Sequence, residues 1–267
     1  MSFLTTVIKE QIQNFYLIQR LSLYEMKSTN KNNYLGMLWE LLNPAIQVVV
    51  FYFVFGIGIK QTDDIGEVPF FIWMIIGLLV WFFVNPSITQ GSKAIYSRIK
   101  MVSKMNFPLS VIPTYVIISK FYPHVALISL TAIVLQFTGY PISIYFIQLP
   151  YFMLSTVIFL IALSLITSTL STIARDVQML VQSLMRVLLY VTPILWSPYV
   201  SLPAWGLKLM MINPLFYLIE GYRAALLGDG WYIWSTYSLY FWGVVVVMLL
   251  IGSALHVKFR KHFIDFL

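Results

Sequence analysis

The sequence has no cysteine, and charged residues make up only 10% of its 267 residues. The absence of cysteine excludes a disulfide framework, a thiolate nucleophile and a cysteine-ligated metal. The scarcity of charge, with a hydrophobic content of 60% and a mean hydropathy of +0.82, does not fit a soluble globular domain. These features predict an all-α integral membrane protein.

A nucleotide-binding motif is also missing. No G-x-x-x-x-G-K-[ST] string occurs, so the chain has no P-loop to hold ATP phosphates. The formal charge of +7 is not gathered into one solvated, aromatic-rich face, which argues against nucleic acid as a partner. We therefore expect no enzymatic activity, no metal site and no cofactor in this chain. The first 20 residues lack the continuous apolar core of a signal peptide and are expected to be retained.

Long apolar runs are what the sequence has in abundance. A membrane-crossing helix needs roughly 20 mainly apolar residues, and six runs meet that length. They cover residues 37–59, 69–90, a stretch within 109–138, 145–171, 177–197 and 233–256. The sequence therefore predicts six transmembrane helices in a single domain over residues 1–267.

The predicted crossings divide the connecting segments between the two sides of the membrane. Lysine and arginine gather on the cytoplasmic side of membrane proteins. One side carries Lys9, Arg20, Lys27 and Lys31, then Lys93, Arg98, Lys100 and Lys104, then Arg175, and finally Lys258, Arg260 and Lys261. The other side carries only Lys60, Lys208 and Arg223. The pattern predicts a plasma-membrane protein with both termini in the cytoplasm.

The region 1–32 precedes the first run and has a different pattern. Within residues 3–24, apolar side chains recur near helical spacing, with polar side chains between them. This predicts an amphipathic helix in the inner membrane interface. A soluble helix packed in a core is the alternative, but little soluble chain is left to cover it.

Residues 198–230 lie between the fifth and sixth runs and are apolar but broken by proline and glycine. Two short helices, 203–211 and 214–227, fit between the breaks and predict an external re-entrant hairpin. Glu220 and Arg223 are spaced i, i+3 and can pair on one helix face. They either fix the hairpin at the outer interface or lie near the exit of a transport route.

The basic stretch 92–108 predicts a short cytoplasmic helix of about ten residues that ends before Pro108. Its candidate contact residues for a cytoplasmic partner are Arg98, Ile99, Lys100, Met101 and Lys104. The alternative is that these basic side chains only follow the positive-inside rule and bind anionic lipid.

Candidate residues of a transport path lie inside the apolar runs. Lys120 and His124, spaced i, i+4, could meet a phosphate; alternatively Lys120 snorkels and His124 is an ordinary interior histidine. Arg186 is either a phosphate contact or half of an interhelical pair. Tyr52 and Phe55 are aromatic side chains that either line such a path or face lipid and neighbouring helices.

Four strings together resemble a known family. "NYLGMLWELLNPAIQ" (33–47), "VSKMNFPLSVIPTY" (102–115), "IARDVQMLVQSLMRVLLYVTPILW" (173–196) and "NPLFYLIEGYRAALL" (213–227) are similar to permease subunits of ABC exporters for cell-surface polysaccharides. The resemblance is closest to the exporters of wall teichoic acid in Gram-positive bacteria, and it runs essentially end to end.

The resemblance implies a permease homodimer with two copies of a separate, TarH-like ATPase that binds ATP and Mg. It implies export of polyprenyl-diphosphate-linked teichoic acid. It also favours residues 92–108 as the coupling helix, which is the cytoplasmic helix that contacts the ATPase. Another lipid-linked polysaccharide and a small amphiphile or drug are the alternative cargoes. A membrane glycosyltransferase is disfavoured, because the only adjacent acids, Asp63 and Asp64, have no histidine nearby.

Overall fold

The computed structural model describes residues 2–58, 65, 68–99 and 107–263. Within these ranges every regular element is a helix, apart from one isolated bridge between Ile65 and Val68. The described part of the chain therefore confirms the all-α prediction.

Five helical segments in the described ranges are long and apolar enough to cross a membrane. They are Gly36–Gly58, Phe70–Ser92, Val111–Gln136, Ile144–Ile173 and Thr236–Phe259. The 23 residues of α4 (Phe70–Ser92) extend about 35 Å, more than the roughly 30 Å of hydrocarbon. The others contain α6 (Val111–Gln136), η3 (Ile144–Gln148) with α7 (Leu149–Ile173), and α12 (Thr236–Phe259). Five of the six predicted runs thus correspond to full-length helices.

The first crossing segment is built from three pieces. Its central helix α3 (Trp39–Phe51) follows the short turn η1 (Gly36–Leu38) and continues into the π-helix η2 (Tyr52–Gly58). Only 6% of the residues in its most apolar window are buried. The segment therefore packs against the rest of the chain far less than the other crossing helices do.

The sixth predicted run, 177–197, is not a full-length helix. The structure has α8 over Asp176–Val191, which at 16 residues is about 24 Å long and too short to cross alone. The predicted end at residue 197 is wrong because Pro193 disfavours a helical backbone at Thr192, which is extended at φ −72° and ψ 134°. The count of six full-length helices is not confirmed.

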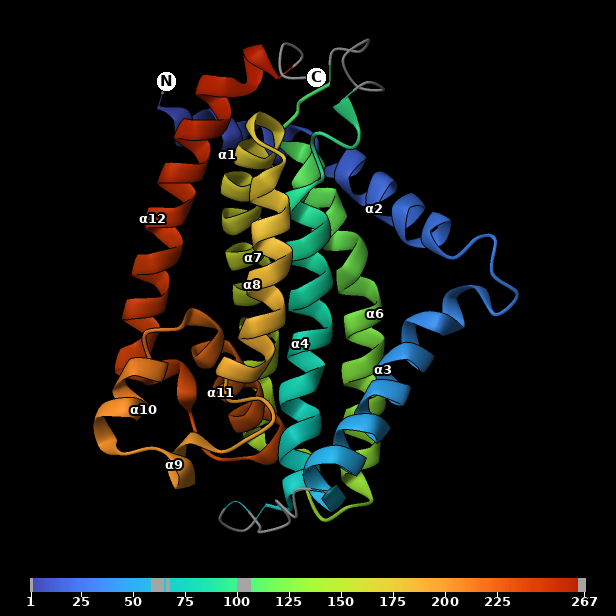
Figure 1. Ribbon diagram of the computed structural model, residues 1–267, viewed down its shortest axis with the longest axis vertical. Coiled ribbons are helices and arrows are strands. Elements are labelled where there is room, and N and C mark those ends of the chain that lie inside the picture. Colours follow the sequence, from blue (N-terminus) through green and yellow to red (C-terminus); the bar gives the residue numbers. More distant parts are fainter. Residues whose placement is uncertain (1, 59–64, 66–67, 100–106, 264–267) are drawn as a thin grey trace.

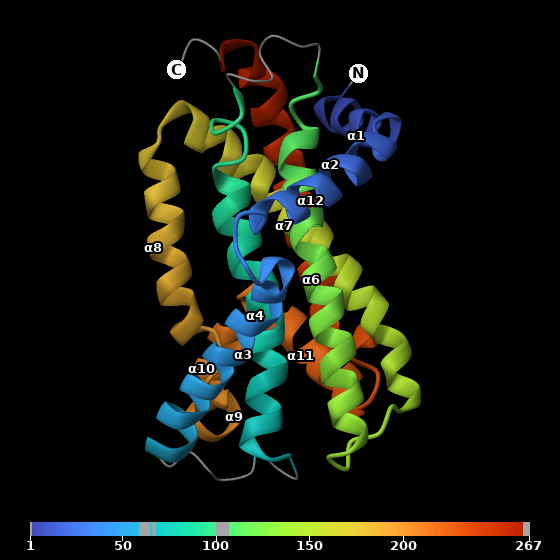
Figure 2. The ribbon, with the colours of Figure 1, turned by 90° about the vertical axis from the view of Figure 1, so that its right-hand side faces the viewer.

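The bundle is organised around α4, which contacts α6, α7, α8 and the short helix α11 (Pro214–Leu227). Helices α4, α6, α7 and α12 run along the long axis, and the beginning of α1 and the end of α12 lie at the same end of the molecule (Figure 1). Turning the molecule by 90° shows that α3 is inclined to that axis (Figure 2).

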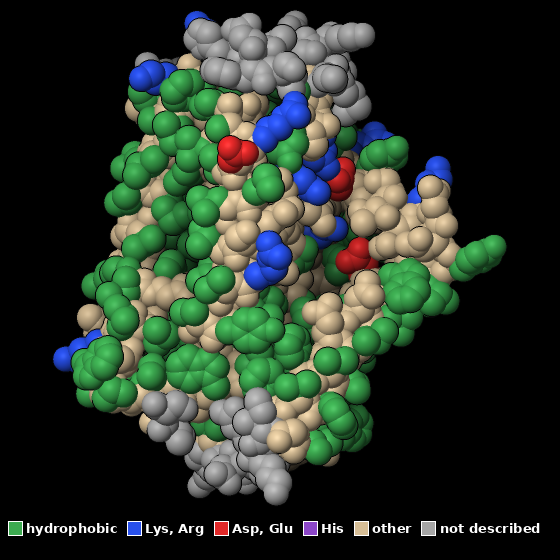
Figure 3. Space-filling view, in the orientation of Figure 1, with side chains coloured by type: hydrophobic (Ala, Val, Ile, Leu, Met, Phe, Trp, Pro, Cys, Tyr) green, Lys and Arg blue, Asp and Glu red, His purple; other side chains and the backbone are tan. Residues whose placement is uncertain are grey.

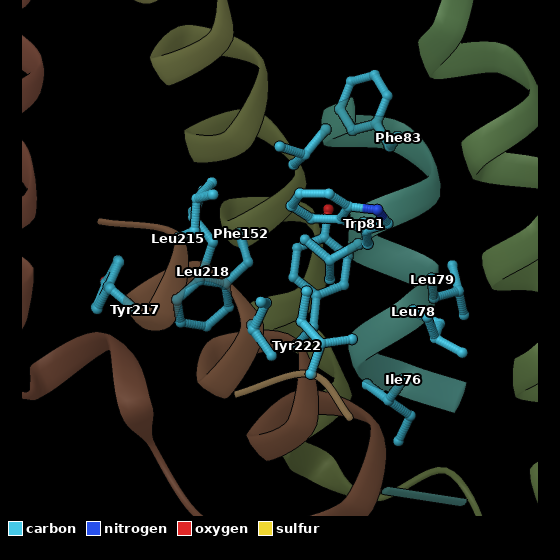
Figure 4. Packing of buried hydrophobic residues seen from close by; sticks show 14 of the residues in the cluster. Ile76, Leu78, Leu79, Trp81, Phe83, Phe152, Leu215, Tyr217, Leu218 and Tyr222 are labelled. Carbon is cyan, nitrogen blue, oxygen red and sulfur yellow. The ribbon is translucent and has the colours of Figure 1, made fainter. Parts of the chain in front are cut away.

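Large aromatic side chains fill the space between α4, α7 and α11. Phe152 of α7 and Tyr217 and Tyr222 of α11 are almost completely buried there (Figure 4). Phe83 of α4 is also buried, against Phe121 and His124 of α6. Because lipid is as apolar as these side chains, close packing rather than the hydrophobic effect must hold the helices together.

Small residues allow the closest helix contacts. A Cβ added to Gly91 of α4 would overlap Ser164 of α7, and one added to Gly252 of α12 would lie 3.0 Å from Leu165 Cβ. These are the small-residue contacts expected where membrane helices approach closely.

The N-terminal segment forms two helices, where the sequence predicts one over 3–24. Helix α1 (Phe3–Gln13) contacts α12, and α2 (Phe15–Thr29) contacts α6. Asn14 separates them, and its side-chain amide donates to the Glu10 carbonyl oxygen at 2.8 Å. This hydrogen bond competes with the helical ladder, as asparagine often does, and so breaks the predicted single helix.

Three short helices follow α8: α9 (Pro198–Ser201), α10 (Ala204–Met210) and α11. The last two match the predicted helices 203–211 and 214–227. Asn213 caps α11 by accepting from the Leu215 amide, Pro214 occupies its first turn, and Gly228 ends it at φ 84°. The short turns η4 (Tyr232–Trp234) and η5 (Arg260–His262) flank α12.

Candidate functional site

Arg223 and Glu220 form the ion pair that their spacing predicts, but inside the protein. Arg223 Nη1 donates to Glu220 Oε1 at 2.6 Å, and Arg223 is only 3% exposed. Its Nη2 donates to the carbonyl oxygen of Pro193 at 3.1 Å, and its guanidinium carbon lies 3.3 Å from the ring centroid of Trp73. The pair therefore joins α11 to α4 and to the turn after α8.

Tyr199 completes this cluster. Its phenol donates to Glu220 Oε2 at 3.0 Å. Burial and the negative charge of Glu220 both raise the pKa of Tyr199 above its usual value, so the phenol stays protonated and remains a donor. The Glu220 carboxylate is thus held from two sides, which fixes the hairpin in place.

A second link joins α11 to the end of α8. The Asn213 side-chain amide donates to Thr192 Oγ1 at 3.0 Å, next to Pro193, whose carbonyl accepts from Arg223. The two contacts involve the consecutive residues Thr192 and Pro193. The turn after α8 is therefore attached to α11 at two places, Asn213 and Arg223.

Only part of the predicted coupling helix lies within the described residues. Residues 93–98 form turns rather than a helix, and Lys100, Met101 and Lys104 lie outside the described ranges. Arg98 forms an ion pair with Glu25 of α2. Ile99 is 1% exposed and packs with Ile18 and Val116, so its side chain is not available to a partner in this structure.

The same end of the molecule carries a second ionic link that the sequence prediction missed. Glu10 of α1 accepts from Arg260 Nη1 at 2.6 Å and from the Ser110 hydroxyl. Gln11 donates to the Ser110 carbonyl oxygen at 2.9 Å. The acids on the polar face of the amphipathic segment were the available signal, but their partners are distant in sequence.

His124 is packed in the interior. Its Nε2 lies 2.9 Å from the Tyr222 hydroxyl, and its ring stacks on Phe83 with centroids 4.6 Å apart. His124 therefore lies between α4, α6 and α11.

Lys120 and His124 line a cavity of about 210 Å³ between α3, α4 and α6. Its other polar walls come from Glu40, Asn43, Gln47 and Asn85, and its apolar walls from Trp39, Pro44, Trp81, Phe82, Pro86, Pro123 and Leu127. Basic and acidic side chains surround a hollow on the side of the molecule where α2 and α3 lie (Figure 3). The cavity brings together two of the predicted path residues.

The remaining path candidates lie elsewhere. Arg186 is exposed on α8, where its guanidinium donates only to Ser183 Oγ, at 3.2 Å, within the described residues. Tyr52 is 36% exposed and contacts Phe71 edge-on, and Phe55 packs against the main core. The structure does not bring these three residues into the cavity that contains Lys120.

Arg186 belongs to a polar stripe on an otherwise apolar helix. Gln178, Gln182 and Arg186 follow each other at intervals of four residues on α8. Gln182 and Arg186 are exposed and Gln178 is partly buried. This side of α8 is therefore unsuited to direct contact with lipid.

Comparison with known proteins gives a consistent result. The family model for ABC-2 type transporters matches residues 16–227. The chain is 28% identical over 219 residues to the O-antigen export system permease protein RfbA of Myxococcus xanthus. The matched region covers 82% of this chain and 83% of that protein. It is 24% identical over 245 residues to RfbA of Klebsiella pneumoniae, which covers 91% of this chain and 92% of the relative.

Proposed function

Because this chain belongs to the ABC-2 type transporter family, we propose that it is the membrane-spanning subunit of an exporter that moves a lipid-linked cell-surface polysaccharide. The O-antigen export permeases to which it is similar over most of both chains support this cargo class. Transport, rather than chemistry on the glycan, is the role we assign to it.

The polar stripe of α8 is the observation that carries the proposal. A charge in hydrocarbon costs about 2.5 to 3.5 kcal/mol on insertion scales, so the exposed Arg186 must face water or protein. We assign the stripe to a water-lined path closed by a second copy of the chain. We assign Tyr52 and Phe55 to the same path as aromatic surface for sugar rings.

The chain direction supports a sixth crossing. The beginning of α1 and the end of α12 lie at one end of the molecule (Figure 1), which requires an even number of crossings between them, and five described segments are long and apolar enough to cross. We propose that α8 and the buried residues Ile194 and Leu195 complete the sixth, with α9 to α11 as a hairpin entering from the outer face. The termini would then be cytoplasmic, as the positive-inside rule predicts.

Energy would come from two cytoplasmic ABC ATPase subunits that bind ATP and Mg. The segment 92–108 is the proposed docking element, with Arg98, Lys100, Met101 and Lys104 as its contacts. Replacing Lys100 and Lys104 by glutamate should weaken copurification of the ATPase at low salt. The double variant Glu25→Arg with Arg98→Glu keeps an opposite-charge pair at this place. It therefore tests whether Arg98 contributes to binding of the ATPase or only to the contact with α2.

Wall teichoic acid, the cargo of TarG-type permeases in Gram-positive bacteria, is the second candidate. The strings at 33–47 and 213–227 favour it, whereas the O-antigen relatives favour another lipid-linked polysaccharide. A small amphiphile is the third candidate cargo.

One reconstitution distinguishes these cargoes. The chain and its ATPase are placed in proteoliposomes, and ATP hydrolysis is measured with a lipid-linked O-antigen-type glycan, a lipid-linked teichoic acid precursor or a small amphiphile. We expect stimulation by a lipid-linked glycan, and a loss of that stimulation in Arg186→Ala but not in the control Lys208→Ala. Stimulation by small amphiphiles alone would refute the proposal.

A further inference from the structure

Lys120 has no partner in the cavity that it lines. It is 7% exposed, and within the described residues its ammonium group forms no hydrogen bond or ion pair. An ammonium group with no protein partner can be satisfied only by water or by a bound group. The cavity therefore has a fixed positive charge that an anionic group would stabilise.

A negative charge lies in another wall of the same cavity. Glu40 of α3 lines it, and its Oε1 accepts from the Asn30 side chain at 2.8 Å, but no ion pair joins it to Lys120. The formal charges of the two residues cancel. A ligand that satisfies both must carry an anionic and a cationic group at once.

Amides provide the remaining polar surface. The side chains of Asn43, Gln47 and Asn85 line the cavity and form no hydrogen bonds within the described residues. Glu40, Asn43 and Gln47 recur at intervals of three and four residues, so they share one face of α3. Each free amide offers both a donor and an acceptor to a bound polar group.

The cavity lies beside the amphipathic helix α2. Ser22 of the amphipathic helix α2 lies 3.0 Å from the hydroxyl of Tyr122, and Tyr122 precedes the wall residue Pro123. Amphipathic helices of this kind lie in the membrane interface. The cavity is therefore next to the helix that the sequence assigns to the inner membrane interface.

An apolar groove leads away from the cavity along α4 and α6. The adjoining hollow of about 300 Å³ shares Pro44, Phe82 and Leu127 with the cavity. A further hollow of about 320 Å³ shares Ile75 and Leu130 with the first and reaches Thr138. From Leu127 to Gln136, where α6 ends, the helical rise gives about 14 Å, close to the thickness of one hydrocarbon leaflet.

We propose that this cavity and groove bind one phospholipid with a zwitterionic primary-amine headgroup of the phosphatidylethanolamine type. Lys120 and the amides bind its phosphate, Glu40 accepts from its ammonium group, and one hydrocarbon chain lies in the groove. A lipid diphosphate fits less well, because its net negative charge meets a wall whose formal charges cancel. The site does not depend on the transport role.

Three phospholipids that differ only in their headgroup distinguish the contact to the phosphate from the contact to the ammonium group. Native mass spectrometry of the full-length chain is titrated with phosphatidylethanolamine, phosphatidylcholine and phosphatidylglycerol. Phosphatidylcholine keeps the positive charge but has no N–H, and phosphatidylglycerol has no positive charge. Loss of a charged hydrogen bond weakens binding about tenfold, so phosphatidylethanolamine should bind about tenfold more tightly than either. This comparison uses the unmodified protein and so does not depend on whether a variant folds.

Two variants then assign the contacts. Glu40→Gln should remove most of the preference for phosphatidylethanolamine, whereas Lys120→Gln should weaken all three lipids about tenfold because each has the phosphate. Lys208→Gln, on the exposed face of α10, is the matched control and should change nothing. Equal binding of the three lipids, tightest binding of phosphatidylglycerol, or no lipid bound to the unmodified chain would overturn the proposal.

Discussion

Arg223 connects three parts of the fold through a single side chain. Its partners are the Glu220 carboxylate, the Pro193 carbonyl and the Trp73 ring. The sequence predicted the first from the i, i+3 spacing, but not the other two, because a distant carbonyl and an indole ring have no local pattern. Residue-scale pairing was thus predictable within one helix and not between helices.

Replacing Arg223 should be more costly than replacing Glu220. Arg223→Met leaves a largely buried carboxylate without its cation, which we expect to cost about 3–5 kcal/mol of unfolding free energy. Glu220→Gln leaves the guanidinium on Pro193 and Trp73 and should cost about 1–3 kcal/mol. Unfolding of both variants in detergent, followed by circular dichroism, tests the order. Equal losses would show that the Pro193 and Trp73 contacts contribute nothing.

Gly221 is required where α11 meets α7. A Cβ at this position would collide with the buried ring of Phe152, so Gly221→Ala should cost about 1–3 kcal/mol through overpacking. Gly243→Ala in α12 is the control, because nothing lies within 4 Å of its added Cβ. There alanine should be neutral or stabilising by up to about 1 kcal/mol, since it favours helix. A matched loss of thermal stability in the two variants would contradict the packing argument.

At the scale of elements, hydrophobic length predicted most of the helices and failed at their interruptions. The runs at 69–90 and 233–256 match α4 and α12 within a few residues, because a continuous apolar stretch in lipid must be helical. Pro193 shortened α8, and Asn14 divided the N-terminal helix. Both are single-residue backbone effects that a window of 20 residues averages out.

The attachment of α1 can be tested separately from the stability of the bundle. Glu10 accepts hydrogen bonds from Arg260 and from the Ser110 hydroxyl. Partly exposed ion pairs contribute only about 0.2–1 kcal/mol each to the free energy of unfolding. Glu10→Gln should therefore speed amide hydrogen exchange in residues 3–13 while leaving the unfolding temperature nearly unchanged. Lys9→Gln, one residue away, is the control. Unchanged exchange in Glu10→Gln would show that apolar packing alone holds α1.

At the scale of the whole molecule, basic side chains are concentrated toward the end that carries both chain termini on the face shown in Figure 3. The sequence predicted this asymmetry, because loop charges follow the membrane and not the details of packing. It could not predict the cavity at Lys120, since its walls come from three helices far apart in the chain.

The absence of cysteine makes the orientation directly measurable. In Lys31→Cys and Lys208→Cys the engineered thiol is the only one in the chain, and both positions are exposed. The proposed orientation, with both termini in the cytoplasm, predicts that a membrane-impermeant maleimide labels Lys208→Cys in intact cells and Lys31→Cys only after permeabilisation. The reverse labelling order would mean that the chain is inserted the other way round.

The attachment of Thr192 and Pro193 to two places on α11 has a mechanical consequence. Asn213 and Arg223 lie ten residues, or about 15 Å, apart along α11 and bind two neighbouring residues of the chain. A displacement of the end of α8 would therefore act on α11 at two separate points, so that the helix is turned as well as shifted.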